Sequence, residues 1–319
     1  MKVSPALVLF FLAPAIGELL SGSAPPAEFF NPIILLLLSS LYGSGALLMR
    51  EFKVRWNKGY VSLLVLGAAY GIIEEGLMVK SFFDPGWMDL GILGAYGRWL
   101  EVNWVWSEWL TIYHAIFSIV IPITLVELAY ADVRNERWLS NRELAGVTSL
   151  LCVVTVFGCV FLTTYHPPLL QYLLSAVLVG ALFLLAWKIP NKIGKNGSLN
   201  PWRPSRLALF GFITTLALFL LFGAGPNIIG HPPVLMLLGI TLVFTVFSLL
   251  RRYEWNERRL YNKFALAAGA LGFFIMLTPL QELDNSRLDN TQGMFIVGIA
   301  ATIMLILLRK RLKSRVQVT

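Results

Sequence analysis

Charged residues are scarce in this sequence. Asp, Glu, Lys and Arg make up 14% of the chain, whereas they make up about 25% of a typical soluble domain. Hydrophobic residues account for 57%, and the mean hydropathy is +0.70. This composition excludes an ordinary soluble protein, so we expect a membrane protein.

Cysteine is nearly absent as well. Cys152 and Cys159 are the only two, and both fall in one apolar segment. On a helix, their spacing corresponds to a rise of about 10 Å, which is too far for a disulfide without backbone movement. Neither a disulfide framework nor a cysteine metal site is available. We interpret both as buried packing residues, and we expect no metal and no cofactor.

Long apolar runs dominate the sequence instead. A membrane-spanning helix needs about 20 mostly apolar residues, and ten segments approach or reach that length. We therefore predict an all-α, polytopic transmembrane helix bundle of about ten spans. The predicted spans are 4–23, 32–49, 59–79, 104–130, 144–164, 168–187, 207–225, 233–250, 260–281 and 292–308.

Positive charge alternates between the connecting loops. One alternate set of loops holds 23 of the 26 Lys and Arg residues, and the other set holds only Lys80, Arg98 and Arg287. Cytoplasmic loops carry an excess of Lys and Arg, so this asymmetry predicts cytoplasmic N and C termini. It also explains the net charge of +8 by topology, and we expect no nucleic-acid partner.

We expect a single integral membrane domain over residues 1–319, located in the cell (plasma) membrane. Residues 1–130 form the half with the polar intramembrane residues, and residues 131–319 form three further helical hairpins. The outer connection 80–103 is long and rich in Trp, and we expect a short interfacial helix that packs over the polar site. For residues 1–24 a cleaved signal peptide is an alternative, which Glu18 fits poorly.

The stretch LVLGAAYGIIEEGLMVK is apolar enough to cross a bilayer, yet it carries Glu74 and Glu75 side by side. One charged side chain at the membrane centre costs about 2.5–3.5 kcal/mol, so two adjacent ones require a proton or a nearby cation. Gly67 and Gly71 form a small-xxx-small pair, and Glu74 continues their helix face. We predict that the carboxylates point into protein and have a partner on another helix.

The span 104–130 supplies candidate partners. Ser107, Thr111, His114 and Ser118 follow at spacings of four, three and four, which places them on one helix face. We predict that these side chains and the carboxylates line an outward-facing polar cavity. The candidate binding or proton-linked residues are Glu18, Glu74, Glu75, Arg98, Glu108, Thr111, His114 and Ser118.

The segment YGIIEEGLMVK resembles the paired-glutamate helix of the intramembrane glutamic proteases, the CAAX-processing and bacteriocin-immunity superfamily. The resemblance covers about a dozen residues and implies a hydrolase in which Glu74, Glu75 and His114 are catalytic and activate a water. Val79 stands at the arginine position of the motif, and Lys80 follows one place later.

Three functions remain open from the sequence. The favoured hypothesis is proton-linked transport or binding of a small solute or lipid, because protonatable residues meet at one depth of a many-span bundle. The second is an intramembrane glutamic-type hydrolase, and the third is a non-catalytic membrane assembly factor. The expected partners are membrane lipid and a small solute, lipid or membrane peptide.

Overall fold

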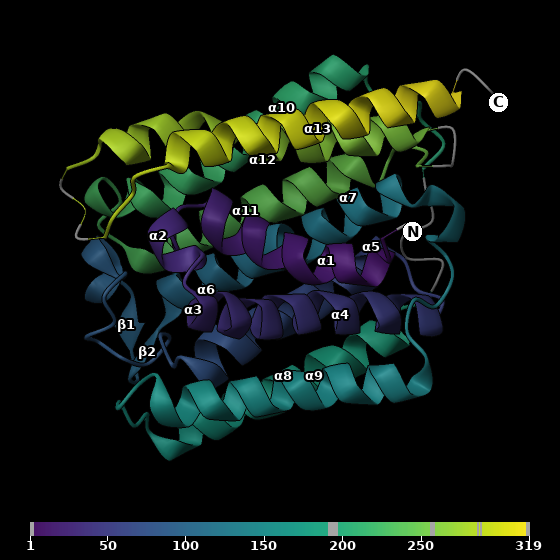
Figure 1. The fold of residues 1–319 in the computed structure, drawn as a ribbon. Helices are drawn as coiled ribbons and strands as arrows, with labels where there is room; N and C mark the ends of the chain where they lie inside the picture. Colours follow the sequence, from purple (N-terminus) through teal and green to yellow (C-terminus); the bar gives the residue numbers. More distant parts are fainter. Residues whose placement is uncertain (1–2, 191–196, 256–258, 286, 288, 317–319) are drawn as a thin grey trace.

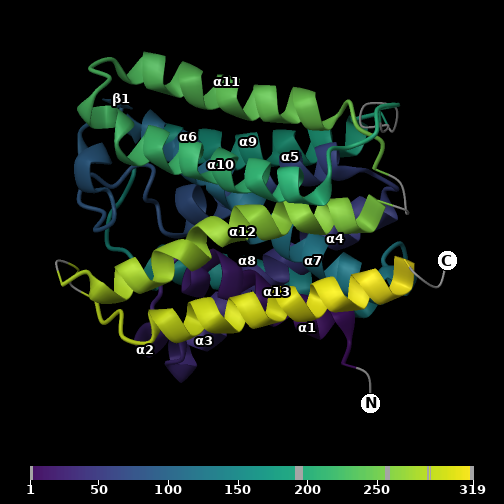
Figure 2. The same ribbon diagram turned by 90° about the horizontal axis from the view of Figure 1, so that it is seen from above.

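A computed structural model of the protein describes residues 3–190, 197–255, 259–285, 287 and 289–316. The chain forms a bundle of long helices that lie alongside one another, with a small two-stranded hairpin at one end (Figures 1 and 2). The predicted all-α class is confirmed.

Each of the ten predicted spans is helical. The first four are α1–η1 (Pro5–Pro14, Ala15–Leu20), α3–η2–α4 (Pro32–Leu38, Ser39–Gly43, Ser44–Arg55), α5–η3 (Tyr60–Gly71, Ile72–Met78) and α6–η5–α7 (Trp104–Tyr113, His114–Val120, Ile121–Ala129). The last six are α8 (Asn141–Phe161), α9 (Leu169–Lys188), α10 (Pro204–Gly223), α11 (Pro232–Leu250), α12 (Leu260–Leu283) and α13 (Met294–Val316). Short helical turns are α2 (Pro26–Phe29), η4 (Gly91–Gly94), η6 (Ala131–Val133) and η7 (Gly225–Asn227).

Eight of these segments in the described chain are long and apolar enough to cross a membrane. The two others are Pro5–Leu20, which is apolar but shorter, and α13, whose last turns carry the basic run Arg309, Lys310 and Arg311. The multi-pass membrane architecture is therefore confirmed. Its full count of ten spans stays a prediction.

The first four spans hold the centre of the bundle. Within Trp104–Ala129, 72% of the most apolar window is buried in the protein, whereas the value is 6% for α9. In Figure 1, α8 and α9 lie along one edge of the bundle, and α12 and α13 lie along the opposite edge. Apolar side chains on such outer helices would otherwise face water, so their exposure indicates a lipid environment.

Glycine faces set the closest helix contacts. A Cβ atom added to Gly67 would lie 2.8 Å from the Ala115 Cα, and one added to Gly71 would lie 3.1 Å from the His114 Cβ. The predicted glycine face of α5 therefore packs directly against η5. This close approach brings Glu74, one turn further along, to the level of His114.

Helices α10 and α12 approach even more closely. A Cβ atom on Gly269 would lie 1.9 Å from the Ala208 carbonyl oxygen, and one on Gly211 would lie 2.4 Å from the Leu266 carbonyl oxygen. The two glycines thus face each other's helix backbone in a reciprocal contact. Small residues at such positions let transmembrane backbones pack without intervening side chains.

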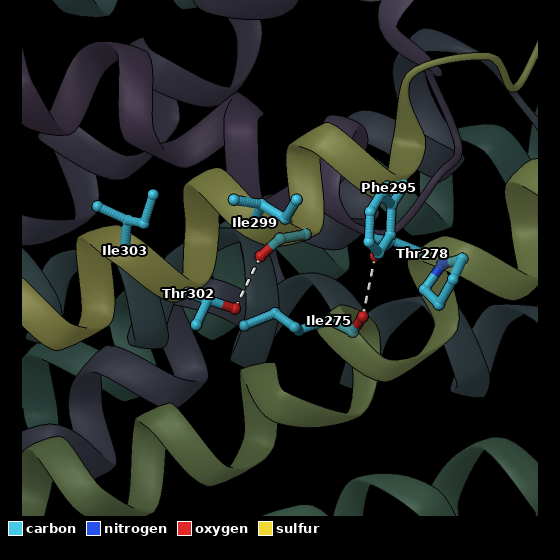
Figure 3. A pocket seen from close by; sticks show the side chains of 8 residues that line it. Ile275, Thr278, Phe295, Ile299, Thr302 and Ile303 are labelled. Atoms are coloured by element: carbon cyan, nitrogen blue, oxygen red, sulfur yellow. Dashed lines mark hydrogen bonds between the residues drawn. The ribbon is translucent and has the colours of Figure 1, made fainter.

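A shallow apolar groove runs between α12 and α13 (Figure 3). Thr278 Oγ1 donates to the Ile275 carbonyl at 2.9 Å, and Thr302 Oγ1 donates to the Gly298 carbonyl at 2.8 Å. Because both hydroxyls bond within their own helix, the surface of the groove is mainly apolar. Its lining residues are Ile275, Thr278, Pro279, Phe295, Gly298, Ile299, Thr302 and Ile303.

The outer connection differs from its prediction. Instead of an interfacial helix it contains the single turn η4 and a hairpin of β1 (Arg98–Trp99) and β2 (Val102–Asn103). Leu100 and Glu101 make the two-residue turn with φ of 50° and 61°, as a type I′ turn requires. The hydrogen bonds of the hairpin satisfy backbone N–H and C=O groups of this connection, which a helix would satisfy in another way.

One prediction at the positively charged end is wrong. The helix of the second span continues to Arg55, and Arg50 is fully buried rather than part of a loop. Glu127 of α7 is also buried and accepts from Lys53 Nζ at 2.5 Å. Carboxylates from the same and a neighbouring helix compensate these cations, so the charges need not reach water.

The interpretation of the cysteines as buried is also wrong for Cys152, which is exposed on the outer surface of α8. Cys159 is half-buried, and its Sγ lies 3.2 Å from the Tyr172 hydroxyl oxygen. The seven-residue spacing on one straight helix keeps the two apart, as expected.

The side of the membrane on which the termini lie stays a prediction. Helix α1 begins and helix α13 ends at the same end of the bundle (Figure 1). In a variant without native cysteines, Trp255→Cys should react with an impermeant maleimide only after cells are permeabilised. Ile228→Cys, in the η7–α11 connection at the opposite predicted side, should react in intact cells. Labelling of residue 255 in intact cells would contradict the topology.

Candidate functional site

Each of the four central spans contains a π-helical turn. At η3 the Val79 N–H bonds to the Glu74 carbonyl at 2.9 Å, and after η5 the Ile121 N–H bonds to the Ile116 carbonyl. Both bonds join residues five apart, as in a π turn, and such turns are frequent at functional sites. The four turns carry the polar residues Glu18, Tyr42, Glu74, Glu75, His114 and Ser118.

His114 lies between the two carboxylates. Its Nε2 atom is 3.0 Å from Glu75 Oε1, and its Nδ1 atom is 3.2 Å from Glu74 Oε2. The Ser118 hydroxyl is a further 2.9 Å neighbour of Nδ1. The imidazole therefore bridges two side chains of η3, and the predicted partner from another helix is confirmed.

The π turn explains how adjacent residues reach one imidazole. In an α-helix, Glu74 and Glu75 would point about 100° apart. A π turn contains more residues, so neighbouring side chains diverge less. Glu74 is 5% exposed, Glu75 is 9% exposed and His114 is 2% exposed. The predicted opening of this centre toward the outside stays a prediction.

The outer connection begins next to Glu75, which its residue Ser81 contacts. Ser81 donates its hydroxyl to Glu75 Oε2, and Trp106 Nε1 donates to the Ser81 oxygen at 3.0 Å. Lys80, expected at the outer surface, is instead buried and donates to the Tyr165 carbonyl at 3.0 Å. The start of the connection thus contacts the centre through Ser81. The packing of the whole connection over an outward opening stays a prediction.

A second carboxylate group adjoins the centre. The Tyr42 hydroxyl donates to Glu18 Oε1, and Glu18 also interacts electrostatically with Glu74 and His114. The Tyr42 ring centroid lies 6.0 Å from that of His114. Gly17 permits this approach, because an added Cβ atom would lie 2.7 Å from Tyr42 Cε1.

Three tyrosines surround the imidazole. Besides Tyr42, the Tyr70 ring lies 6.2 Å and the Tyr113 ring 5.2 Å from His114, measured between centroids. Tyr113 donates its hydroxyl to the Gly17 carbonyl at 2.6 Å. The centre is therefore a polar core inside an aromatic shell.

The structure brings together Glu18, Glu74, Glu75, His114 and Ser118, which we call the carboxylate–histidine centre. Thr111 contributes to its packing rather than its polar contacts, since its Cα atom is 3.3 Å from a Cβ atom placed on Gly71.

Two predicted site residues lie elsewhere. Glu108 faces α11, where its Oε1 atom would be 2.5 Å from a Cβ atom on Gly239, because it lies at the border of the histidine face and turns toward α11. Arg98 lies on β1 and donates to the Phe83 carbonyl at 2.8 Å. The expected convergence of both residues on the centre is therefore wrong.

Sequence reasoning missed the residues that enclose the centre. Tyr70 lies one turn before Glu74 on the same helix, and this spacing could have predicted its position beside the centre. Tyr42 lies in the polar stretch SSLYGSG of an apolar span, and that polar stretch could have predicted its position too. Ser81 and Trp106 meet only through the fold of the connection, and no local pattern indicates that contact.

Acidic side chains lie on the predicted outer side of the centre. Burial and then the negative charge of Glu75 raise the pKa of Asp89. The charge of this loop residue therefore interacts with the charge of the centre. Burial and the charges of Asp289 and Asp89 raise the pKa of Glu28. Hydrogen bonds from Arg287 lower the pKa of Asp289. We call Glu28, Asp89 and Asp289 the acidic rim.

The fold and site together define an integral multi-pass membrane protein with a buried carboxylate–histidine centre. The chain belongs to the uncharacterized membrane protein family, which it matches over residues 7–313. No curated protein and no solved structure matched the chain. The family match spans nearly the whole chain, whereas the resemblance to glutamic proteases is confined to the segment around Glu74 and Glu75.

Proposed function

We propose that this protein binds a small solute at the carboxylate–histidine centre and moves it across the plasma membrane in exchange with protons. The observation that carries the proposal is the bridge of His114 between Glu74 and Glu75, inside four helices that each contain a π turn. Ionisable residues within membrane spans mark ion and proton pathways.

The interrupted helices support transport over a purely structural role. Transporters use irregular helices at mid-membrane, where freed backbone groups and side chains meet a substrate. A hydrogen-bonded structural bridge alone would not need four distorted spans, since serine and threonine side chains join regular transmembrane helices well. The outer connection over Glu75 supplies a segment that can cover the centre on one side.

Proteoliposomes that contain a trapped pH-sensitive dye test this proposal. A panel of amino acids, organic anions and divalent cations is added outside, and wild type should give a solute-dependent change of internal pH. Glu75→Gln should abolish the change while keeping the fold, because the amide retains the shape and removes the titrating group. Glu108→Gln is the control, since it alters a carboxylate outside the centre and should behave as wild type.

The same assay separates function from packing. Glu75→Gln and His114→Ala should be non-additive, because both act through one contact. If both variants retain full transport and lose only thermal stability, the centre is a packing feature and the proposal fails.

Hydrolysis is a second candidate, favoured by the 3.0 Å contact between Glu75 Oε1 and His114 Nε2. A carboxylate and an imidazole at this distance can activate a water as a general base. The basic residue nearest to the arginine position of the protease motif is Lys80. Its side chain donates instead to the Tyr165 carbonyl. A quenched fluorescent membrane peptide should be cleaved by wild type and not by Glu75→Gln if this candidate holds.

A further inference from the structure

The ligand set of the centre points to a particular class of solute. One ligand atom from each of Glu74, Glu75 and His114 lies within 4.8 Å of the other two. We propose that these three residues bind one divalent transition-metal cation, of the kind of Zn²⁺ or Mn²⁺. This inference rests on the proposed function, because it names the solute class for the same centre.

An unpartnered oxygen aims into the cluster. Glu74 Oε2 is buried and has no hydrogen-bond partner among the described residues, although it faces His114 Nδ1. A buried carboxylate oxygen left without a partner is costly. A cation at the centre would satisfy it directly, which a hydrogen-bonded packing role does not.

Charge favours a divalent ion. Two ionised carboxylates beside a neutral imidazole carry two negative charges, and one divalent cation neutralises both in a low-dielectric setting. A monovalent ion would leave one charge uncompensated. Among the described side chains, no arginine or lysine forms an ion pair with Glu74 or Glu75, whereas Lys53 and Arg50 compensate Glu127, which lies further along the span of His114.

The donor atoms select among divalent ions. Imidazole suits Zn²⁺ and other transition metals, whereas Ca²⁺ and Mg²⁺ prefer shells made only of oxygen. The two cysteines lie on α8, outside the centre, so no thiolate favours Cu⁺. A tetrahedral ion with bonds of about 2.0–2.2 Å needs donors roughly 3.4 Å apart. Glu74 and Glu75 face different nitrogens of His114, so one carboxylate has to turn toward the nitrogen that binds the ion. Three protein ligands leave one position for water or exchange.

The acidic rim supplies an approach. Asp89 is close enough to the centre that the charge of Glu75 acts on it, and Glu28 and Asp289 act on each other. Negative charge near a binding site raises the local concentration of cations and speeds their association. Asp289 is already paired with Arg287 at 2.5 Å, so Asp89 and Glu28 supply this attraction, which favours a cationic over an anionic solute.

Metal binding to the purified full chain in lipid nanodiscs tests the inference. After equilibrium dialysis with Zn²⁺ or Mn²⁺, wild type should hold about one ion per chain, measured by mass spectrometry of the metal. Glu74→Gln, Glu75→Gln and His114→Gln should each weaken binding at least tenfold. Glu108→Gln should leave it unchanged. X-ray absorption at the zinc edge should show an imidazole scatterer that disappears in His114→Gln.

The outcomes separate this inference from the function on which it rests. If no divalent ion binds, or if Glu108→Gln weakens binding as much as Glu75→Gln, the metal site is wrong. Proton-linked transport of another solute that still depends on Glu75 would then leave the proposed function standing. Stoichiometric binding without ion flux in proteoliposomes would instead support the site and overturn transport. Size-exclusion profiles that match wild type ensure that lost binding is not lost folding.

Discussion

Glu51→Met should lower the free energy of unfolding by about 3–5 kcal/mol, the range for removing one partner of a buried ion pair. Glu51 is completely buried and accepts from Arg50 at 2.7 Å, from Arg55 at 3.0 Å and from the Trp138 N–H at 2.9 Å. Methionine keeps the length of the side chain but removes every acceptor, so three donors lose a partner at once.

Arg50 is the donor most affected by this change, because its buried charge loses its nearest carboxylate. It is fully buried, its guanidinium carbon lies 3.6 Å from the Trp138 ring centroid, and its second carboxylate, Glu127, is 3.6 Å from Nε. Unfolding in mixed detergent micelles measures the loss. The double variant Arg50→Met/Glu51→Met should recover part of it, because the stranded charge is also removed.

Glu136→Met is the matched control for that prediction. Glu136 is exposed in the connection before α8, and surface substitutions usually change stability by less than about 0.5 kcal/mol. An equal loss in both variants would show that the Glu51 network adds nothing beyond general charge, and the prediction would be wrong.

Gly269→Ala should cost about 3 kcal/mol, the upper end of the usual range for overpacking. The added methyl group would lie 1.9 Å from the Ala208 carbonyl oxygen. That oxygen belongs to the backbone of α10, so it cannot rotate away as a side chain would. The two helices must separate, which also opens the reciprocal contact at Gly211.

Gly146→Ala is the matched control, and we expect the same substitution to stabilise the protein at this position. Nothing lies within 4 Å of a Cβ atom at this position on α8, and alanine is a better helix former by about 1 kcal/mol. Thermal unfolding of both variants in one detergent should shift in opposite directions. A neutral Gly269→Ala would mean that the α10–α12 contact is looser than the structure has it.

The position of the carboxylates was predictable because it depends on one helix. Apolar length, loop charge and the Gly67–Gly71 face are local features, and together they place Glu74 inside the bundle. His114 was predictable as a partner for the same reason, since the Ser and Thr residues of its span mark one face. Glu108 was placed wrongly because a residue at the border of that face can turn to either neighbour, and only the position of α11 decides which.

The sequence by itself determined a many-span helical membrane protein with an acidic pair that faces protein, because bilayer thickness and hydrogen bonding impose those features on each segment separately. Only the tertiary structure decided which groups meet the pair. The π turns change the direction of side chains within a helix, and they depend on packing against neighbouring spans. The tyrosine shell, the Ser81 contact and the acidic rim join residues from distant segments. A periodic pattern within one segment therefore cannot predict them.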